Sequence, residues 1–83
     1  MAILRIKTVG AETGNPTATI YKRVKEGTFP RPVPIGARSV GWPSDELAAI
    51  NAARIAGYSD FQLRELVLRL HAKRTVQSPL LNV

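Results

Sequence analysis

Apolar residues recur along this chain at spacings that predict four helices and one β-hairpin, with glycine and proline between them. A short apolar lead runs into a first helix over Lys7–Thr13, which Gly14 ends. A second helix begins after the Asn15–Pro16 turn, because proline suits the start of a helix and glycine the residue after its last turn. The expected helices cover residues 7–13, 17–26, 44–56 and 60–74.

The spacing of apolar residues changes from a helical to an extended pattern between the second and third expected helices. Phe29–Ile35 carries three prolines at alternate positions, a pattern that excludes a helix and predicts an extended edge strand. Gly36–Ser39 is a tight turn, and Val40–Trp42 is the returning strand. An aromatic residue that closes a hairpin usually packs against the core, so we expect Trp42 to be buried.

Residues typical of helix capping precede the last two expected helices. Ser44 is the expected N-cap of the third helix, with acidic residues behind it in the first turn. Ser59 and Gln62 form the pattern of a capping box for the fourth helix. The chain is expected to fray from Thr75. The predicted organisation is a main domain over residues 1–58, a further helix over 59–74 and a flexible tail over 75–83.

The order of the elements is that of a winged helix-turn-helix domain, a mainly α fold with a small β-hairpin, here with an additional C-terminal helix. At about 100° per residue, Thr17, Ile20 and Val24 share one side of the second helix, which predicts a buried stripe. Lys22 lies in the middle of the opposite side. A recognition helix needs this division, because one side docks on the first helix and the other enters the major groove of DNA.

The outward side of the second helix and the hairpin carry the candidate DNA-contacting residues. Methyl groups there could contact thymine methyls, and lysine could reach guanine acceptors or phosphates. An arginine at the hairpin tip could lie along the DNA backbone or enter the minor groove. An ordinary amphipathic surface helix and a solvated loop are the alternatives for these elements. The candidates are Thr17, Ala18, Thr19, Tyr21, Lys22, Arg23 and Lys25 on the helix, with Arg31 on the first strand and Arg38 and Ser39 in the hairpin turn.

Length and charge agree with that interpretation. The 83 residues suffice for one small domain, and 45% apolar with 22% charged residues is ordinary for a globular protein. The formal net charge is +6, and residues 1–42 hold seven basic and two acidic residues. Such a one-sided positive field attracts a polyanion, although a solvated basic surface would have the same composition.

Other classes of function find little support in the residues. The absence of cysteine excludes disulfides, thiolate metal sites and cysteine nucleophiles. The single histidine, His71, has no second histidine or cysteine as a metal partner, and we expect it at the surface, where a cation suits the end of a helix. No phosphate loop or catalytic triad pattern occurs, so we expect neither an enzyme nor a cofactor or metal.

The N-terminus is unlike a signal peptide, and no apolar stretch could span a bilayer, which predicts a cytoplasmic protein without a membrane partner. The basic residues flank prolines and a hairpin and do not form one amphipathic helix, so binding to a membrane surface is also disfavoured. RNA binding is disfavoured because no row of exposed aromatic residues is expected on a sheet.

Several motifs resemble the AlpA family of prophage regulators, which are small MerR-like winged-helix proteins related to phage excisionases. The resemblance covers roughly residues 3–56 and is most specific from Ile20 to Trp42. A later stretch, from Ala49 to Lys73, resembles the longer members, which add a C-terminal helix. The motifs that carry the resemblance are residues 4–9, 12–14, 19–22, 25–33 and 41–43.

The resemblance implies a transcriptional regulator that binds double-stranded DNA, with Tyr21, Lys22 and Lys25 on the DNA-facing helix and Arg38 on the wing. The family often begins that helix with Ser-Arg-Ser, where this chain has Pro16-Thr17-Ala18. A base-reading arginine is therefore absent, which predicts a lower affinity or a different preferred sequence. Two other functions stay open: an excisionase-like recombination factor that also contacts an integrase, and an adaptor or inhibitor that binds another regulatory protein.

The last helix predicts self-association. Leu63, Leu66, Val67 and Leu70 form one apolar stripe, and Phe61 and Leu68 are expected to widen it on one side. Packing against Leu47, Ile50 and Trp42 in the monomer is the alternative. A core of this size can hardly use six large apolar residues from one helix, so we expect part of the stripe to pair two chains into a homodimer.

Overall fold

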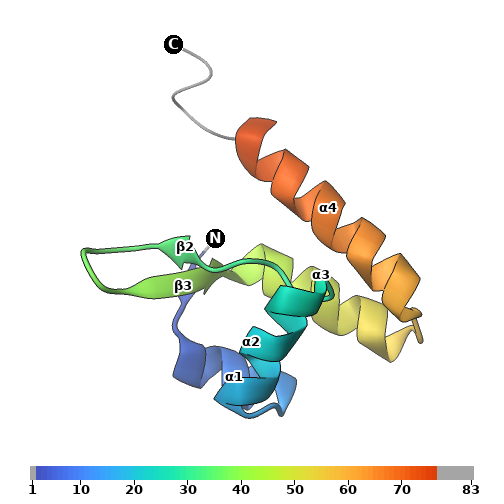
Figure 1. Ribbon diagram of the computed structural model, residues 1–83, viewed down its shortest axis with the longest axis horizontal. Helices are drawn as coiled ribbons and strands as arrows, with labels where there is room; N and C mark the ends of the chain where they lie inside the picture. The colour runs from blue at the N-terminus through green and yellow to red at the C-terminus, as the bar shows by residue number, and fades with distance from the viewer. Residues whose placement is uncertain (1, 77–83) are drawn as a thin grey trace.

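The computed structural model describes residues 2–76, in which four helices pack around one end of a small antiparallel sheet (Figure 1). The elements are β1 (Ile3–Leu4), α1 (Ile6–Thr13), α2 (Thr17–Glu26), β2 (Val33–Pro34), β3 (Val40–Pro43), α3 (Ser44–Ile55) and α4 (Asp60–Val76). All four predicted helices are confirmed to within two residues at each end. The hairpin of β2 and β3 projects from the helices, and α4 runs diagonally past α3. The part of the expected tail at residues 77–83 lies outside the described residues.

The sheet contains a strand that the sequence pattern did not reveal. β1 pairs with β3 on the side away from β2, so the strand order is β1-β3-β2 with Leu4 opposite Trp42 and Val33 opposite Gly41. Gly41 makes this pairing possible: a Cβ there would lie 2.6 Å from Cγ2 of Ile3 and 2.9 Å from the carbonyl oxygen of Leu4. The apolar lead of the chain is therefore an edge strand that draws the N-terminus onto the hairpin.

The first hairpin strand is shorter than predicted. Only Val33–Pro34 pairs with β3, whereas the proline pattern predicted a strand over residues 29–35. Phe29 is 1% exposed, and the carbonyl of Pro30 accepts a hydrogen bond from the indole Nε1 of Trp42 at 2.8 Å. This stretch is extended, as the prolines require, but side chains rather than a neighbouring strand take up its backbone groups.

The helix ends follow the predicted chemistry with one exception. Gly27 ends α2 with φ 84°, and Ser59 and Gln62 form the predicted capping box with hydrogen bonds of 2.9 and 3.2 Å. Ser44 is not the N-cap of α3, because Pro43 occupies that position. The Ser44 hydroxyl instead accepts a hydrogen bond from the backbone N–H of Ala2 at 3.0 Å. The pairing of β1 with β3 brings the N-terminal segment close to Ser44, so the Ser44 side chain bonds Ala2 and does not cap the helix.

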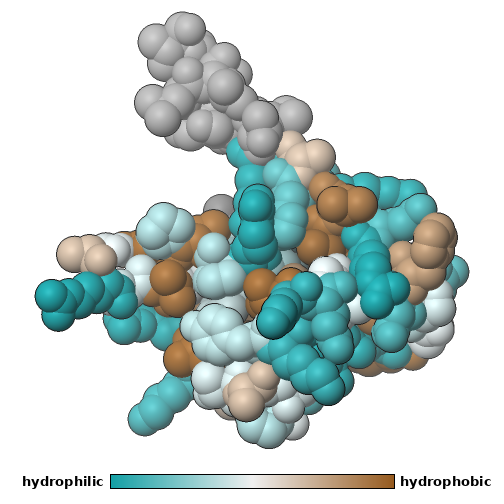
Figure 2. All heavy atoms as spheres, in the orientation of Figure 1, coloured by the Kyte–Doolittle hydropathy of each residue, from teal (hydrophilic) through white to brown (hydrophobic). Residues whose placement is uncertain are grey.

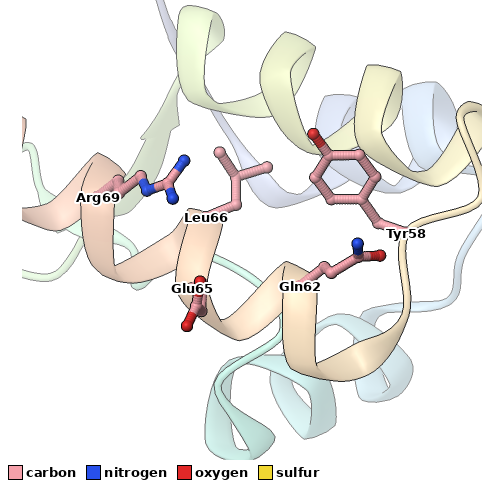
Figure 3. Close-up of a pocket in the computed structure, with 5 residues that line it drawn as sticks. All are labelled: Tyr58, Gln62, Glu65, Leu66 and Arg69. Carbon is pink, nitrogen blue, oxygen red and sulfur yellow. The ribbon is translucent and has the colours of Figure 1, made fainter.

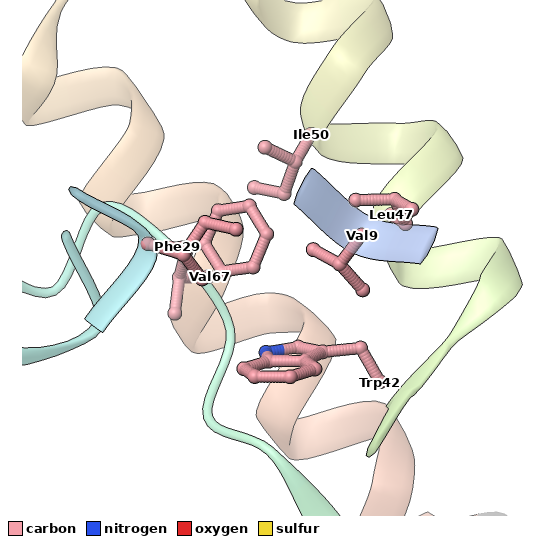
Figure 4. Packing of buried hydrophobic residues seen from close by; sticks show 7 residues of the cluster. Val9, Phe29, Trp42, Leu47, Ile50 and Val67 are labelled. Atoms are coloured by element: carbon pink, nitrogen blue, oxygen red, sulfur yellow. The ribbon is translucent and has the colours of Figure 1, made fainter. Parts of the chain in front are cut away.

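The core lies where α1, α2, α3 and α4 meet the buried end of the hairpin (Figure 4). Trp42 is 1% exposed, which confirms its predicted role in core packing. Thr17 is exposed, so only the Ile20 and Val24 part of the predicted stripe on α2 faces inward. The cluster consists of Val9, Ile20, Phe29, Trp42, Leu47, Ile50 and Val67.

α4 has two apolar sides rather than one widened stripe. Leu63 and Val67 are buried, and Leu66 and Leu70 pack against the core in part, so the predicted stripe closes the monomer. Figure 3 shows Leu66 directed from α4 toward α3, in a hollow that Tyr58 also lines. Phe61 and Leu68 are 66% and 68% exposed. They lie on the opposite side of the helix, because at about 100° per residue they fall half a turn away from the stripe.

Candidate nucleic-acid interface

The outward side of α2 is formed as the sequence predicted. Ile20 is fully buried and Val24 is half-buried against the core, which orients the rest of the helix. Lys22 occupies the middle of the exposed side, and α2 begins at Thr17 with Pro16 at its N-cap. Of the seven predicted residues on α2, the exposed ones are Thr17, Ala18, Tyr21, Lys22 and Lys25, and the half-buried ones are Thr19 and Arg23. The seven candidates spread over about two thirds of the circumference of α2, and Ala18, Lys22 and Lys25 lie together in the middle of its exposed side.

Tyr21 connects this surface to the hairpin. Its ring lies edge-on to the ring of Trp42, with centroids 5.9 Å apart and an interplanar angle of 60°. Trp42 belongs to β3 and also packs edge-on against Phe29 at 6.1 Å. Because edge-to-face aromatic pairs prefer this geometry, the pair holds α2 at a defined distance from the base of the hairpin.

The hairpin turn presents Arg38 to solvent. The backbone N–H of Ile35 donates to the carbonyl of Ser39 at 2.9 Å and closes the loop that carries Arg38. Arg38 is exposed and Ser39 is half-buried. In the space-filling view, hydrophilic side chains gather at the projecting hairpin tip and again over α2 (Figure 2). Two separate polar regions are therefore available to one extended polyanion.

Arg31 precedes the strand on which it was expected. Its side chain is exposed, but both of its backbone groups are held by α4. The Arg31 N–H donates to Nε2 of His71 at 3.1 Å, and the Arg31 carbonyl accepts from Nη2 of Arg74 at 2.7 Å. Because these backbone groups of Arg31 are already hydrogen-bonded to side chains, they do not pair with β3. This explains why β2 begins only at Val33.

A half-buried ion pair between Arg74 and Glu46 supports this contact. The guanidinium of Arg74 donates from Nε and Nη2 to the two carboxylate oxygens of Glu46, at 2.7 and 2.5 Å. Glu46 is 5% exposed and lies in the first turn of α3. Nothing local in the sequence pointed to this pair, because its members are 28 residues apart.

His71 is a neutral hydrogen-bond acceptor rather than the surface cation that the sequence predicted. Burial lowers its pKa, and the positive charges of Arg74 and Arg31 lower the pKa further, against a smaller opposite effect of Glu46. The accepting Nε2 must also be unprotonated to take the N–H of Arg31. Within residues 2–76, no group of three or more histidines and carboxylates could hold a metal ion.

Arg54 extends the basic surface, although no sequence pattern pointed to it. A polar hollow between α2 and the α3–α4 corner includes both Arg23 and Arg54 in its lining. Burial lowers the pKa of Arg54, the charge of Arg23 lowers it further, and Asp60 acts in the opposite direction. The lining residues are Thr19, Lys22, Arg23, Glu26, Thr28, Arg54 and Asp60. This hollow adds a cation from α3 beside α2, where a phosphate would relieve the repulsion between the arginines.

Comparison with known protein families identifies the class of protein to which the chain belongs, that of prophage regulators. The family profile described as prophage CP4-57 regulatory protein (AlpA) matches residues 2–51. The chain belongs to the AlpA family. The family is described as one of regulators, in agreement with the expectation that the chain is not an enzyme.

One relative comes from a phage. The chain is 39% identical over 54 residues to an uncharacterized protein, ORF88, of Enterobacteria phage P4. The matched stretch covers 65% of this chain and 61% of the relative, so the chain spans less than two thirds of that protein's length. No solved structure matches the chain. No helix within residues 2–76 is long and apolar enough to cross a membrane.

Proposed function

We propose that this protein is a sequence-specific regulator that binds double-stranded DNA as a winged helix-turn-helix domain. The observation that carries the proposal is the exposure of Lys22 and Lys25 on α2 and of Arg38 in the hairpin turn, with α2 joined to the base of the hairpin by the contact of Tyr21 with Trp42. Membership of a family of prophage regulators supports a role in controlling phage genes.

In this arrangement α2 enters the major groove and the hairpin serves as the wing. The groove is about 12 Å wide, which admits one helix if the leading side chains are small. Thr17 and Ala18 meet that requirement at the exposed N-terminal turn of α2. Lys22 then reaches base edges from the middle of the helix, and Arg38 lies on the backbone or in the minor groove.

Selection of binding sites from random duplex DNA, at about physiological salt, tests the proposal directly. A consensus sequence is the expected result, and failure to enrich any sequence would contradict a sequence-specific regulator. Because bound helices read bases and wings contact mainly backbone, the two elements should also respond differently to mutation.

We expect Lys22→Ala to relax the preference at one position of the consensus, at a cost of about 1–3 kcal/mol in binding to the preferred site. Arg38→Ala should weaken binding to all sequences more evenly. Binding of each variant to the consensus and to single-position variants of the consensus measures both effects. Lys73→Ala is the matched control, because Lys73 is exposed on α4 and its loss removes the same charge. An unchanged consensus for Lys22→Ala would show that the recognition side of α2 is misplaced.

The outward side of α4 is proposed to pair two copies of the chain. Phe61, Leu68 and Ala72 are exposed there, with Glu65 between them. An antiparallel second α4 would bring each Glu65 toward the flanking arginines of the other copy, and a two-fold dimer would read paired half-sites.

Sedimentation at high micromolar concentration should therefore give a mass near twice 9.1 kDa. The double change Phe61→Ser and Leu68→Ser should return the monomer with its fold intact, because neither residue contributes to the core. Leu63→Ser is the contrasting variant and should destabilise the fold, since Leu63 is 1% exposed. A wild-type chain that stays monomeric would refute the dimer.

A further inference from the structure

α4 contacts the end of α2 and the segment that leads from α2 into the hairpin. Near its N-terminus, Nε of Arg64 donates to the carbonyl of Glu26, the last residue of α2, at 3.1 Å. Near its C-terminus, His71 and Arg74 hold the two backbone groups of Arg31 at 3.1 and 2.7 Å. These attachments are seven to ten residues apart on one helix, which corresponds to roughly 10–15 Å at the rise of an α-helix.

The segment between α2 and β2 depends on these contacts for its path. Residues 28–32 have no strand partner, and the hairpin is paired only from Val33 onward. Within this segment Trp42 holds the carbonyl of Pro30, while α4 holds both backbone groups of Arg31. The direction in which the chain enters the hairpin is therefore set jointly by Trp42 of β3 and by α4, which lies outside the hairpin.

Arg74 is suited to fix that direction because its guanidinium has little freedom. Both oxygens of the buried Glu46 carboxylate accept hydrogen bonds from Nε and Nη2 of Arg74. The second hydrogen of Nη2 is then directed at the carbonyl of Arg31. Only the planar fork of arginine can make this set of contacts, since a lysine ammonium is a point charge on a flexible stem.

We propose that α4 is a brace that sets the position of the hairpin relative to α2, and that Arg74 is a positioning residue for DNA binding that does not itself contact DNA. The DNA-binding part of this inference rests on the proposed function. The family profile ends at residue 51, so the brace comes from a part of the chain outside the match. Without it, the segment that leads from α2 into the hairpin would have to be ordered when DNA binds, which lowers affinity.

Two variants and one control test the brace. Arg74→Lys keeps the positive charge but loses the planar guanidinium, and Arg74→Ala loses both. Lys73→Ala is the control, because it removes a neighbouring exposed charge. The first measurement is amide hydrogen exchange, which needs no DNA. Both Arg74 variants should speed exchange at Arg31 and at Ile35, whose N–H closes the hairpin loop, with no comparable change at the buried Ile50 of α3. Unchanged exchange at Arg31, or an equal increase throughout the chain, would overturn the brace.

The second measurement is affinity for the selected duplex at several salt concentrations. Arg74→Lys should weaken binding roughly 5-fold or more, the equivalent of one net hydrogen bond, while the slope of affinity against salt stays unchanged. Lys73→Ala should change affinity by less than about 2-fold. Full affinity in Arg74→Lys, or a slope reduced by about one in Arg74→Ala, would mean that Arg74 acts as a direct phosphate contact, against the proposal. If the wild-type chain binds no duplex, the proposed function fails, and hydrogen exchange still decides whether α4 positions the hairpin.

Discussion

Replacing Trp42 by alanine should unfold most of the protein at room temperature or lower its melting temperature by more than about 12 °C. The indole is 1% exposed, contacts Tyr21 and Phe29 edge-on, and donates a hydrogen bond to Pro30. Truncation of a buried aromatic side chain costs about 3–5 kcal/mol. A domain of this size has a total stability near the lower end of about 5–15 kcal/mol, so one substitution removes a large part of it.

Circular dichroism during thermal unfolding measures the effect, since the change also removes the single tryptophan as a fluorophore. Trp42→Phe is the graded control, because it keeps an aromatic ring and loses the bond to Pro30; it should fall between alanine and wild type. Phe61→Ala should leave the melting temperature nearly unchanged, because Phe61 is 66% exposed. A Trp42→Ala variant as stable as Phe61→Ala would contradict the packing around the indole.

Binding to duplex DNA should weaken roughly 60- to 250-fold between 50 and 200 mM salt. Lys22, Lys25, Arg31 and Arg38, which we propose to contact phosphates, are exposed. If these cations neutralise about four phosphates, the released counterions give log K against log salt a slope near −3 to −4. A titration of fluorescently labelled consensus duplex at four or more salt concentrations provides the slope.

Single charge deletions resolve which cations contribute. Arg38→Ala should reduce the magnitude of the slope by about one, whereas Lys73→Ala, on the exposed side of α4, should not change it. The chain carries +6 overall, so a flat response to salt would mean that its charge serves another purpose and would contradict the DNA interface.

Local sequence patterns were sufficient for the helices and for the exposed side of α2, with the exception of Thr17, which was expected in the buried stripe. Helix limits depend on neighbouring residues, and Gly27 at φ 84° or the Ser59–Gln62 box has the same effect in any tertiary context. The exposed position of Lys22 likewise follows from its angle to Ile20 on one helix. The candidate residues on α2 and in the hairpin turn therefore follow from local periodicity and turn chemistry alone.

Only the tertiary structure decided the partners that lie far apart in the chain. The apolar N-terminal segment forms β1 because Gly41 leaves room for it beside β3. The Ser44 hydroxyl then accepts a hydrogen bond from the N–H of Ala2 and does not cap α3. The spacing of about 100° per residue already places Phe61 and Leu68 opposite the stripe of α4, and the tertiary structure decided that the stripe is the side that packs against the core. Periodicity cannot say which of two apolar sides will find a partner.

The same limit applies to the contacts that fix the interface. His71 and Arg74 reach Arg31 across 40 and 43 residues, and Arg74 reaches Glu46 across 28. The sequence around His71 and Arg74 predicts only that they lie on the solvated surface of a helix. The residues that they contact are determined by the way α4 packs across the molecule. The sequence alone thus determined which side of α2 is exposed, because that depends on local periodicity. The folded chain determined how α2, α4 and the segment that leads into the hairpin are held together, because that depends on contacts between residues far apart in the sequence.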